Sequence, residues 1–143
     1  MAVKQISVFI ENKPGRLGAV ANVLYQNKLD MRAMNIAESV DFGILRIIAT
    51  DSYNTVRVLQ DEGYICSITD VLGAAIPDEP GSMCSLLTLL DENGINLEYT
   101  YAFVGRKVGK ACVIFRVPDE DADRAAELLR QQGVQLIDQD DLV

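Results

Sequence analysis

The chain repeats itself once, and this repeat restricts it to a fold built from two copies of a small unit. Pro14-Gly15 recurs 66 residues later as Pro80-Gly81, and the same offset places Asp30 on Asn96. Apolar positions on both sides of the Pro-Gly pair also match: Ile6, Val8, Ile10, Leu17, Val20, Ala21 and Leu24 align with Leu72, Ala74, Ile76, Met83, Leu86, Leu87 and Leu90. A fixed period of this length marks a structural repeat, so we expect two domains, residues 1–70 and 71–143.

The first copy reads in the order strand, helix, strand, strand, helix, strand. Alternating apolar residues predict strands. A helical apolar stripe predicts a first helix that begins at Pro14. Gly63 is typical of the end of the second helix. The predicted strands are 6–11, 31–40, 44–50 and 64–69, the second helix is 53–62, and Asp41-Phe42-Gly43 is the predicted hairpin turn.

The second copy follows the same order. Its predicted strands are 71–76, 97–104, 110–117 and 134–137; its helices are 80–93 and 119–132; a hairpin turn lies around 105–109. Asp119 is the expected N-cap of the last helix. Almost no linker is present near Asp70, so the last strand of copy one should run nearly straight into the first strand of copy two.

The βαββαβ order predicts an α+β fold of two tandem ferredoxin-like units, each an antiparallel sheet with both helices on one face. The other face of each sheet needs a cover, either by units packed face to face or by sheets joined side by side. We therefore expect a homodimer.

Composition argues against several classes of function. The formal net charge of −8 disfavours a nucleic-acid partner, because phosphate binding needs clustered lysine and arginine. No apolar run approaches the roughly 20 residues of a membrane span, and the alternating N-terminus lacks a signal-peptide core. Three cysteines without a CxxC pair predict neither a disulfide framework nor a zinc site. We expect a protein of the reducing cytoplasm, without metal or cofactor.

The chain contains no histidine, which removes the commonest general base and excludes a Ser-His-Asp or Cys-His arrangement. Neither GxGxxG nor GxxxxGK[ST] occurs. We therefore expect a protein that is not an enzyme. A small enzyme that uses only carboxylates and backbone groups is the least favoured alternative.

The loop between the first strand and the first helix of each copy is the candidate ligand site. The first N–H groups of a helix lack internal partners and attract a carboxylate. Gly15 lets a ligand approach the backbone, and Asn12 can donate and accept hydrogen bonds. The alternative is that Asn12 only caps the helix and Pro14-Gly15 only shapes the turn. Recurrence of the loop as Asp78-Glu79-Pro80-Gly81 strengthens the functional interpretation.

A second polar position opens the following strand, at Asp30 in copy one and Asn96 in copy two. We expect this residue to lie close to the first loop, where it would hold an ammonium group while the helix N–H groups hold a carboxylate. That pair of contacts suits a zwitterionic amino acid. The alternative is that both residues are turn residues ahead of a strand.

A family resemblance is carried by ENKPGRLGAVANVLYQNKLDMRAMNIAES, residues 11–39. This segment resembles the ACT domain, a small regulatory module of phosphoglycerate dehydrogenase and other enzymes of amino-acid metabolism. The match rests on the N-x-P-G-x-L turn and the polar residue at Asp30, and it covers almost the whole chain as two ACT units. The resemblance implies amino-acid binding at interfaces between paired units. It implies site residues Asn12, Gly15, Arg16, Leu17 and Asp30 in copy one and Asp78, Gly81, Ser82, Met83 and Asn96 in copy two.

The copies depart from each other and from the family. Asp78 would repel a ligand carboxylate and attract an ammonium, so the two sites should differ in affinity. The Glu-Ser-Arg-Pro motif of phenylalanine-sensing ACT modules is absent, because Glu38-Ser39 is followed by Val40. Two functions follow from the sequence: a regulatory protein that binds an amino acid and acts through a partner or its own assembly, or an interaction module for a metabolic enzyme with vestigial ligand loops.

Overall fold

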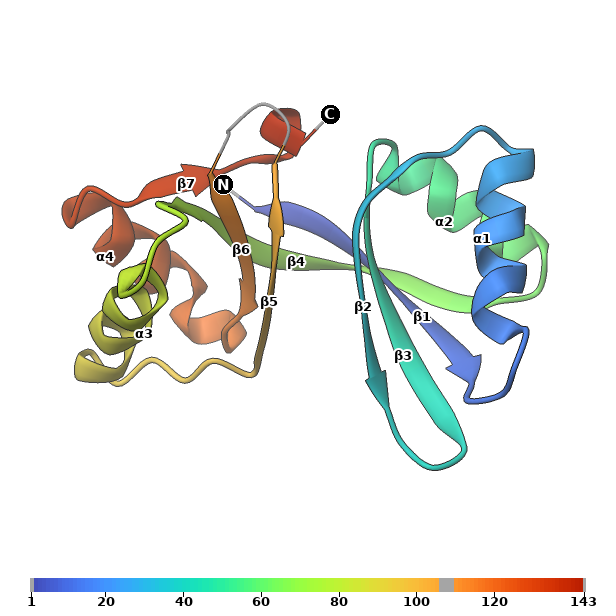
Figure 1. Ribbon diagram of the computed structural model, residues 1–143, viewed down its shortest axis with the longest axis horizontal. Coiled ribbons are helices and arrows are strands. Elements are labelled where there is room, and N and C mark those ends of the chain that lie inside the picture. The colour runs from blue at the N-terminus through green and yellow to red at the C-terminus, as the bar shows by residue number, and fades with distance from the viewer. Residues whose placement is uncertain (1, 106–109, 143) are drawn as a thin grey trace. The chain divides into compact units, whose positions relative to one another are not determined.

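The computed structural model describes residues 2–105 and 110–142, so residues 106–109 of the predicted second hairpin turn lie outside the described residues. The described chain divides into an N-terminal unit, residues 4–69, and a C-terminal unit that comprises residues 70–142 together with Ala2 and Val3. Each unit has the α+β, ferredoxin-like architecture that the sequence predicts, with both helices on one face of an antiparallel sheet (Figure 1).

The N-terminal unit contains β1 (Val3–Glu11) from Lys4 onward, α1 (Arg16–Gln26), β2 (Met31–Glu38), β3 (Phe42–Ala49), α2 (Ser52–Asp61) and the first part of β4 (Ile65–Ile76). Its strand order is β4-β1-β3-β2, so β2 is an edge strand. The side chains between sheet and helices are fully or almost fully buried: Ile6, Val8, Ile10, Val20, Leu24, Leu45, Ile47, Ala49 and Leu59.

The C-terminal unit contains the second half of β4, α3 (Ser82–Glu92), β5 (Tyr99–Val104), β6 (Ala111–Arg116), the 3₁₀ turn Asp119–Asp121, α4 (Ala122–Gln131), β7 (Gln135–Ile137) and a final 3₁₀ turn, Gln139–Leu142. Its strand order is β7-β4-β6-β5. Its core is equivalent to that of the first unit, with Leu72, Ala74, Leu86 and Leu90 at positions that the repeat predicts.

The predicted continuity at the join between the copies is confirmed, because β4 is one unbroken strand of 12 residues. The helices α1 and α3 begin two residues later than predicted, at Arg16 and Ser82, because Gly15 and Gly81 precede them in the left-handed conformation. The predicted hairpin turn is also displaced. Phe42 and Gly43 already belong to β3, and the Ser39 N–H donates to the Phe42 carbonyl.

The prediction that Asp119 caps the last helix is wrong. Residues 119–121 form a 3₁₀ turn, and α4 begins only at Ala122. The Asp119 carboxylate accepts a hydrogen bond from the Arg116 guanidinium at 2.9 Å instead. In this bond both partners are charged, whereas in a capping bond from a backbone N–H only the carboxylate would be charged.

Candidate functional site

The loop between β1 and α1 leaves the first residues of α1 exposed to solvent. Gly15 has φ of 85° and precedes the helix without a side-chain capping bond. The Arg16 N–H donates to the Lys13 carbonyl and the Ala19 N–H to the Gly15 carbonyl. Between them, the N–H groups of Leu17 and Gly18 have no acceptor among the described residues. Two adjacent amides therefore point out of the helix end, as an anion-binding helix terminus requires.

Asn12 does not cap this helix. Its side-chain amide donates to the Ser39 carbonyl at 2.9 Å, with the Val40 carbonyl at 3.5 Å. Its backbone N–H donates to the Asp41 carbonyl at 2.9 Å. Asn12 therefore ties the β1–α1 loop to the tip of the β2–β3 hairpin. We call these contacts the Asn12 latch.

Ion pairs fix the side chains beside the first loop. Glu11 contacts Lys13 at 2.9 Å and Arg16 at 3.3 Å. The hydrogen bond from Lys13 and the charge of Arg16 lower the pKa of the Glu11 carboxyl. Because Glu11 already holds Arg16, this guanidinium is not free to receive a ligand carboxylate unless the pair opens.

The second loop has the same backbone geometry and different side chains. Gly81 has φ of 94°, the Ser82 N–H donates to the Glu79 carbonyl, and the Ser85 N–H donates to the Gly81 carbonyl. Met83 and Cys84 therefore present the two open amides in the described part of this loop. Asp78 replaces Asn12 and has no donor with which to build a latch. Its exposed carboxylate forms no ion pair within the described residues.

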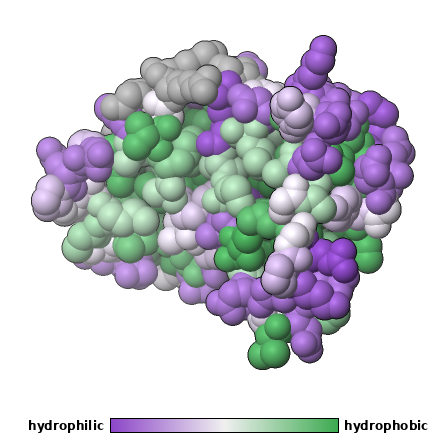
Figure 2. All heavy atoms as spheres, turned by 45° about the vertical axis from the view of Figure 1, so that its right-hand side comes forward, coloured by the Kyte–Doolittle hydropathy of each residue, from purple (hydrophilic) through white to green (hydrophobic). Residues whose placement is uncertain are grey.

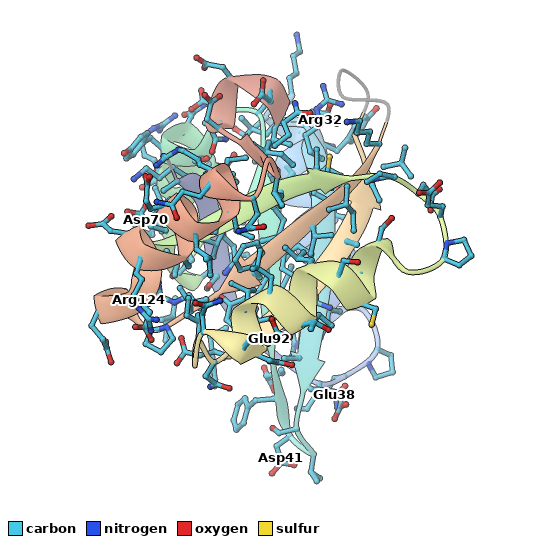
Figure 3. The ribbon with its side chains drawn as sticks, turned by 90° about the vertical axis from the view of Figure 1, so that its left-hand side faces the viewer. Arg32, Glu38, Asp41, Asp70, Glu92 and Arg124 are labelled. Carbon is cyan, nitrogen blue, oxygen red and sulfur yellow. The ribbon has the colours of Figure 1, made fainter. Side chains whose placement is uncertain are left out.

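The expectation that Asp30 lies close to the first loop is wrong for a single unit. The Thr50 N–H donates to the Asp30 carbonyl, whereas Asn12 bonds to Asp41. The eight residues of β3 lie between Asp41 and Thr50, so nine residue steps separate these two positions, which corresponds to about 30 Å. Figure 3 shows Arg32, which forms an ion pair with Asp30 at 3.1 Å, at the opposite end of the hairpin from Glu38 and Asp41.

Asn96 likewise lies at the opposite end of its unit from the loop that contains Asp78. The Glu98 N–H donates to the Arg116 carbonyl, so residues before Glu98 lie at the Arg116 end of β6. Ile76 pairs with Ala111, which places Asp78 at the other end, five residues of β6 away or about 16 Å. The physical reason is shared by both units. Each first helix carries the chain back along the sheet, so the next strand starts at the far end.

The remaining predicted residues lie around the helix starts. Leu17 and Met83 pack partly buried against the cores of their own units. Arg16 and Ser82 occupy equivalent positions in two equivalent grooves, each between the end of a first strand, the start of a first helix and the segment after the second helix. Of the predicted residues in each copy, the structure therefore brings together those of the loop and leaves Asp30 and Asn96 apart.

The two grooves differ in size. The groove of the N-terminal unit has a volume of about 200 Å³ and contains Glu11, Arg16 and Tyr64. The groove of the C-terminal unit has a volume of about 630 Å³, and Pro77, Ser82 and Val134 stand at the corresponding positions. The larger groove continues along α3, where it is lined by residues that the sequence reasoning missed: Cys84, Ser85, Leu86, Thr88, Leu89 and Glu92. These residues recur along one face of α3, and this spacing is the sequence feature from which the groove lining could be predicted.

Residues 2–105 and 110–142 contain no group of acidic or cysteine side chains placed to hold a metal ion. Within these ranges no helix has the length and apolarity that crossing a membrane requires. The three cysteines are free thiols, and burial raises the pKa of Cys66 and Cys112.

Comparison with known proteins agrees with this architecture. A protein from Bacteroides thetaiotaomicron of known crystal structure is 37% identical, with a TM-score of 0.90 over 99% of this chain and 96% of that one. The ligand-free regulatory subunit of aspartate kinase from Thermus thermophilus is 13% identical, with a TM-score of 0.64 over 90% of this chain and 91% of that one. The corresponding subunit from Thermus flavus is 14% identical, with a TM-score of 0.63 over 90% of each chain.

No protein with a curated description matches the chain. The model of the ACT domain pair matches residues 1–143. The chain therefore belongs to the family of ACT domain pairs.

Proposed function

We propose that this protein is a non-enzymatic regulator that binds an amino acid at the loop between the first strand and the first helix of each unit. We further propose that the loop of the C-terminal unit is the stronger site. The observation that carries the proposal is the recurrence of one loop geometry in both repeats, with a left-handed glycine and two open amides each time. The structural likeness to a regulatory subunit of aspartate kinase supports a regulatory role.

The C-terminal loop offers separate groups for the two charges of a zwitterion. The amides of Met83 and Cys84 lie at the positive end of an 11-residue helix, which suits a carboxylate. Asp78 lies on the same loop, exposed and without an ion-pair partner in the described chain, which suits an ammonium group. Both groups of the ligand can then bind within one unit, without Asn96.

The groove beside this loop provides room for the ligand side chain. Its volume of about 630 Å³ lies within the range of small-molecule pockets, about 300–1,000 Å³. The equivalent groove of the N-terminal unit falls below that range, at about 200 Å³. Arg16, held by Glu11, stands there in the place of Ser82. The proposal therefore assigns the first binding event to the C-terminal unit.

A thermal-shift screen of the twenty amino acids tests the function, because a ligand that binds only the native state raises its stability by mass action. Calorimetry with the best ligand should show loss of binding in Asp78→Ala and in Ser82→Arg. The second change installs the residue that copy one accommodates at the same position, so it should fill the groove without unfolding the unit. Glu79→Ala, an adjacent exposed carboxylate, is the matched control and should bind normally. No shift with any amino acid would reject the proposal.

The second candidate is an interaction module whose loops no longer bind ligand. It is favoured by an exposed apolar cluster on the sheet face of the N-terminal unit that carries no helix. Phe9 and Phe42 stack there at 4.9 Å between ring centroids, beside Ile44, and the three side chains are 40–44% exposed. Apolar side chains reach the surface among hydrophilic ones in Figure 2. Stoichiometric recovery of one metabolic enzyme, unaffected by added amino acids, would favour this candidate.

A further inference from the structure

We propose that the groove of the C-terminal unit selects an amino acid with an uncharged aliphatic side chain, and that Leu89 sets this preference. The inference rests on the proposed function, because it concerns the side chain of the ligand that the loop binds. The observation that carries it is the chemistry of the residues that line the groove.

The end of the groove next to the loop is apolar. It is lined by Ile76 and Pro77 at the end of β4, by Val134 just before β7, and by Leu86, one turn into α3. Ile76 and Leu86 belong to the core of the unit, and Val134 packs against that core. A ligand side chain that enters here exchanges water for a hydrocarbon surface. Each methylene group buried in this way should strengthen binding about four-fold.

Leu89 extends this apolar surface along α3. Ser82, Ser85 and Leu89 line the groove at intervals of three and four residues, which is the spacing of one helix face. The Leu89 side chain is only partly buried against the core. Its Cα lies about 9 Å along the helix axis from that of Met83, and a helical side chain leans over the turn that precedes it. A ligand side chain of three or four carbons should therefore reach Leu89 beyond Leu86.

The charges of the groove disfavour an acidic ligand side chain. Its described lining residues include no lysine or arginine, so a ligand side-chain carboxylate would lose water without gaining a cationic partner. The one charged group among them, Glu92, stands at the far end of α3 from the loop (Figure 3), about 15 Å from Ser82 along the helix axis. Glu92 is exposed, so an ion pair with a basic ligand side chain would contribute little.

The equivalent groove of the N-terminal unit carries charges where the C-terminal groove is neutral. Glu11 and Arg16 form an ion pair there at 3.3 Å. Pro77 and Ser82 stand at the corresponding positions of the C-terminal groove. The preference for an aliphatic side chain therefore belongs to the C-terminal unit.

Calorimetry with a homologous series of amino acids tests the apolar surface on the wild-type chain. The probes are alanine, 2-aminobutyrate, norvaline and norleucine, which differ by one methylene group at each step. The dissociation constant should fall about four-fold per step. Leucine should bind at least about ten-fold more tightly than aspartate, which has nearly the same shape.

The outcomes separate the inference from the proposed function. Equal affinity along the series, or tighter binding of aspartate than leucine or of lysine than norleucine, would overturn the inference and leave amino-acid binding at the loop standing. Absence of binding by every probe and by all twenty amino acids would reject the proposed function, and the inference with it.

Leu89→Ser tests the residue that sets the preference. It should weaken norleucine binding at least about ten-fold, whereas alanine, whose side chain is too short to reach position 89, should bind as before. Val23→Ser is the matched control, because the 66-residue offset places Val23 on Leu89 and Val23 is also partly buried against the core of its unit. An unchanged ratio of norleucine to alanine affinity in folded Leu89→Ser would refute the role of Leu89.

Thr88→Lys tests the charge of the groove without altering a core residue, because Thr88 lines the groove and is exposed. The added cation should lower the ratio of leucine to glutamate affinity at least about ten-fold, since it offers a side-chain carboxylate a charge-assisted hydrogen bond. Thermal unfolding checks that each variant is folded. This variant decides the matter if Leu89→Ser fails to fold, and an unchanged ratio in Thr88→Lys would show that the ligand side chain does not lie in the groove.

Discussion

Replacing Asn12 by aspartate should loosen the β2–β3 hairpin while leaving the size of the side chain unchanged. The change removes the donor of the 2.9 Å bond to the Ser39 carbonyl and sets a carboxylate beside the Ser39 and Val40 carbonyl oxygens. The backbone bond from Asn12 to Asp41 remains. The perturbation therefore acts on one contact, and it reproduces the residue that copy two carries as Asp78.

A net hydrogen bond contributes about 0.5–1.5 kcal/mol, and the latch is exposed, which favours the lower half of that range. Repulsion between the carboxylate and the carbonyl oxygens adds to the loss. We expect Asn12→Asp to lower the free energy of unfolding by about 1 kcal/mol. For a chain of this size, a change of that order lowers the melting temperature by about 3–5 °C.

Hydrogen exchange measured by mass spectrometry locates the effect. Peptides that span residues 39–42 should exchange faster in Asn12→Asp, while α2 and the C-terminal unit remain unchanged. Asn22→Asp is the control, because Asn22 is exposed on α1 and makes no side-chain hydrogen bond in the described chain. Equal exchange of the hairpin in the two variants would refute the latch.

Three further predictions follow from separate features. Gly81→Ala should cost about 1–2 kcal/mol in urea unfolding, because φ is 94° and no atom lies within 4 Å of the added Cβ, so the cost is in the backbone alone. Ser52→Ala should leave the stability unchanged or raise it by up to about 1 kcal/mol, because the buried Ser52 hydroxyl has no partner among the described residues. Burial raises the pKa of the Cys66 and Cys112 thiols above the ordinary value of 9.0. The stabilisation that comes from burying these thiols in the protonated form should therefore be complete below pH 9.0. It should be lost as the pH rises through the higher pKa values that the thiols have in the folded protein. Urea unfolding midpoints measured below and above pH 9.0 test whether stability falls as the pH rises.

The repeat allowed the element order, the cores and the continuous β4 to be predicted, because matched apolar positions define faces and a missing linker defines continuity. Two errors in the fold had local causes. Gly15 and Gly81 delay the helices because a left-handed residue cannot continue a helix. Asp119 binds the guanidinium of Arg116, three residues earlier in the chain, instead of capping α4.

The candidate site was only half predictable. Loop residues such as Gly15 and Gly81 are adjacent in sequence, so their geometry follows from local rules. The partner of Asn12 is 27 residues away and could have been found only from the register of β1 on β3. The predicted position of Asp30 is wrong because α1, with 11 residues at about 1.5 Å each, returns the chain to the other end of the sheet.

Because β4 is one unbroken strand, the same alternation of inward and outward side chains runs through both repeats. Cys66 and Ile68 face the core of the first unit, and Leu72, Ala74 and Ile76 face the core of the second, so even-numbered positions point inward on both sides of Asp70. Side chains alternate along a strand with a period of two. Because each core fixes its own inward positions, insertion of a single residue at the junction would have to be absorbed as a β-bulge, whereas insertion of two would keep the alternation on both sides. The 66-residue offset between the two copies is itself an even number, so it satisfies this parity without a spacer.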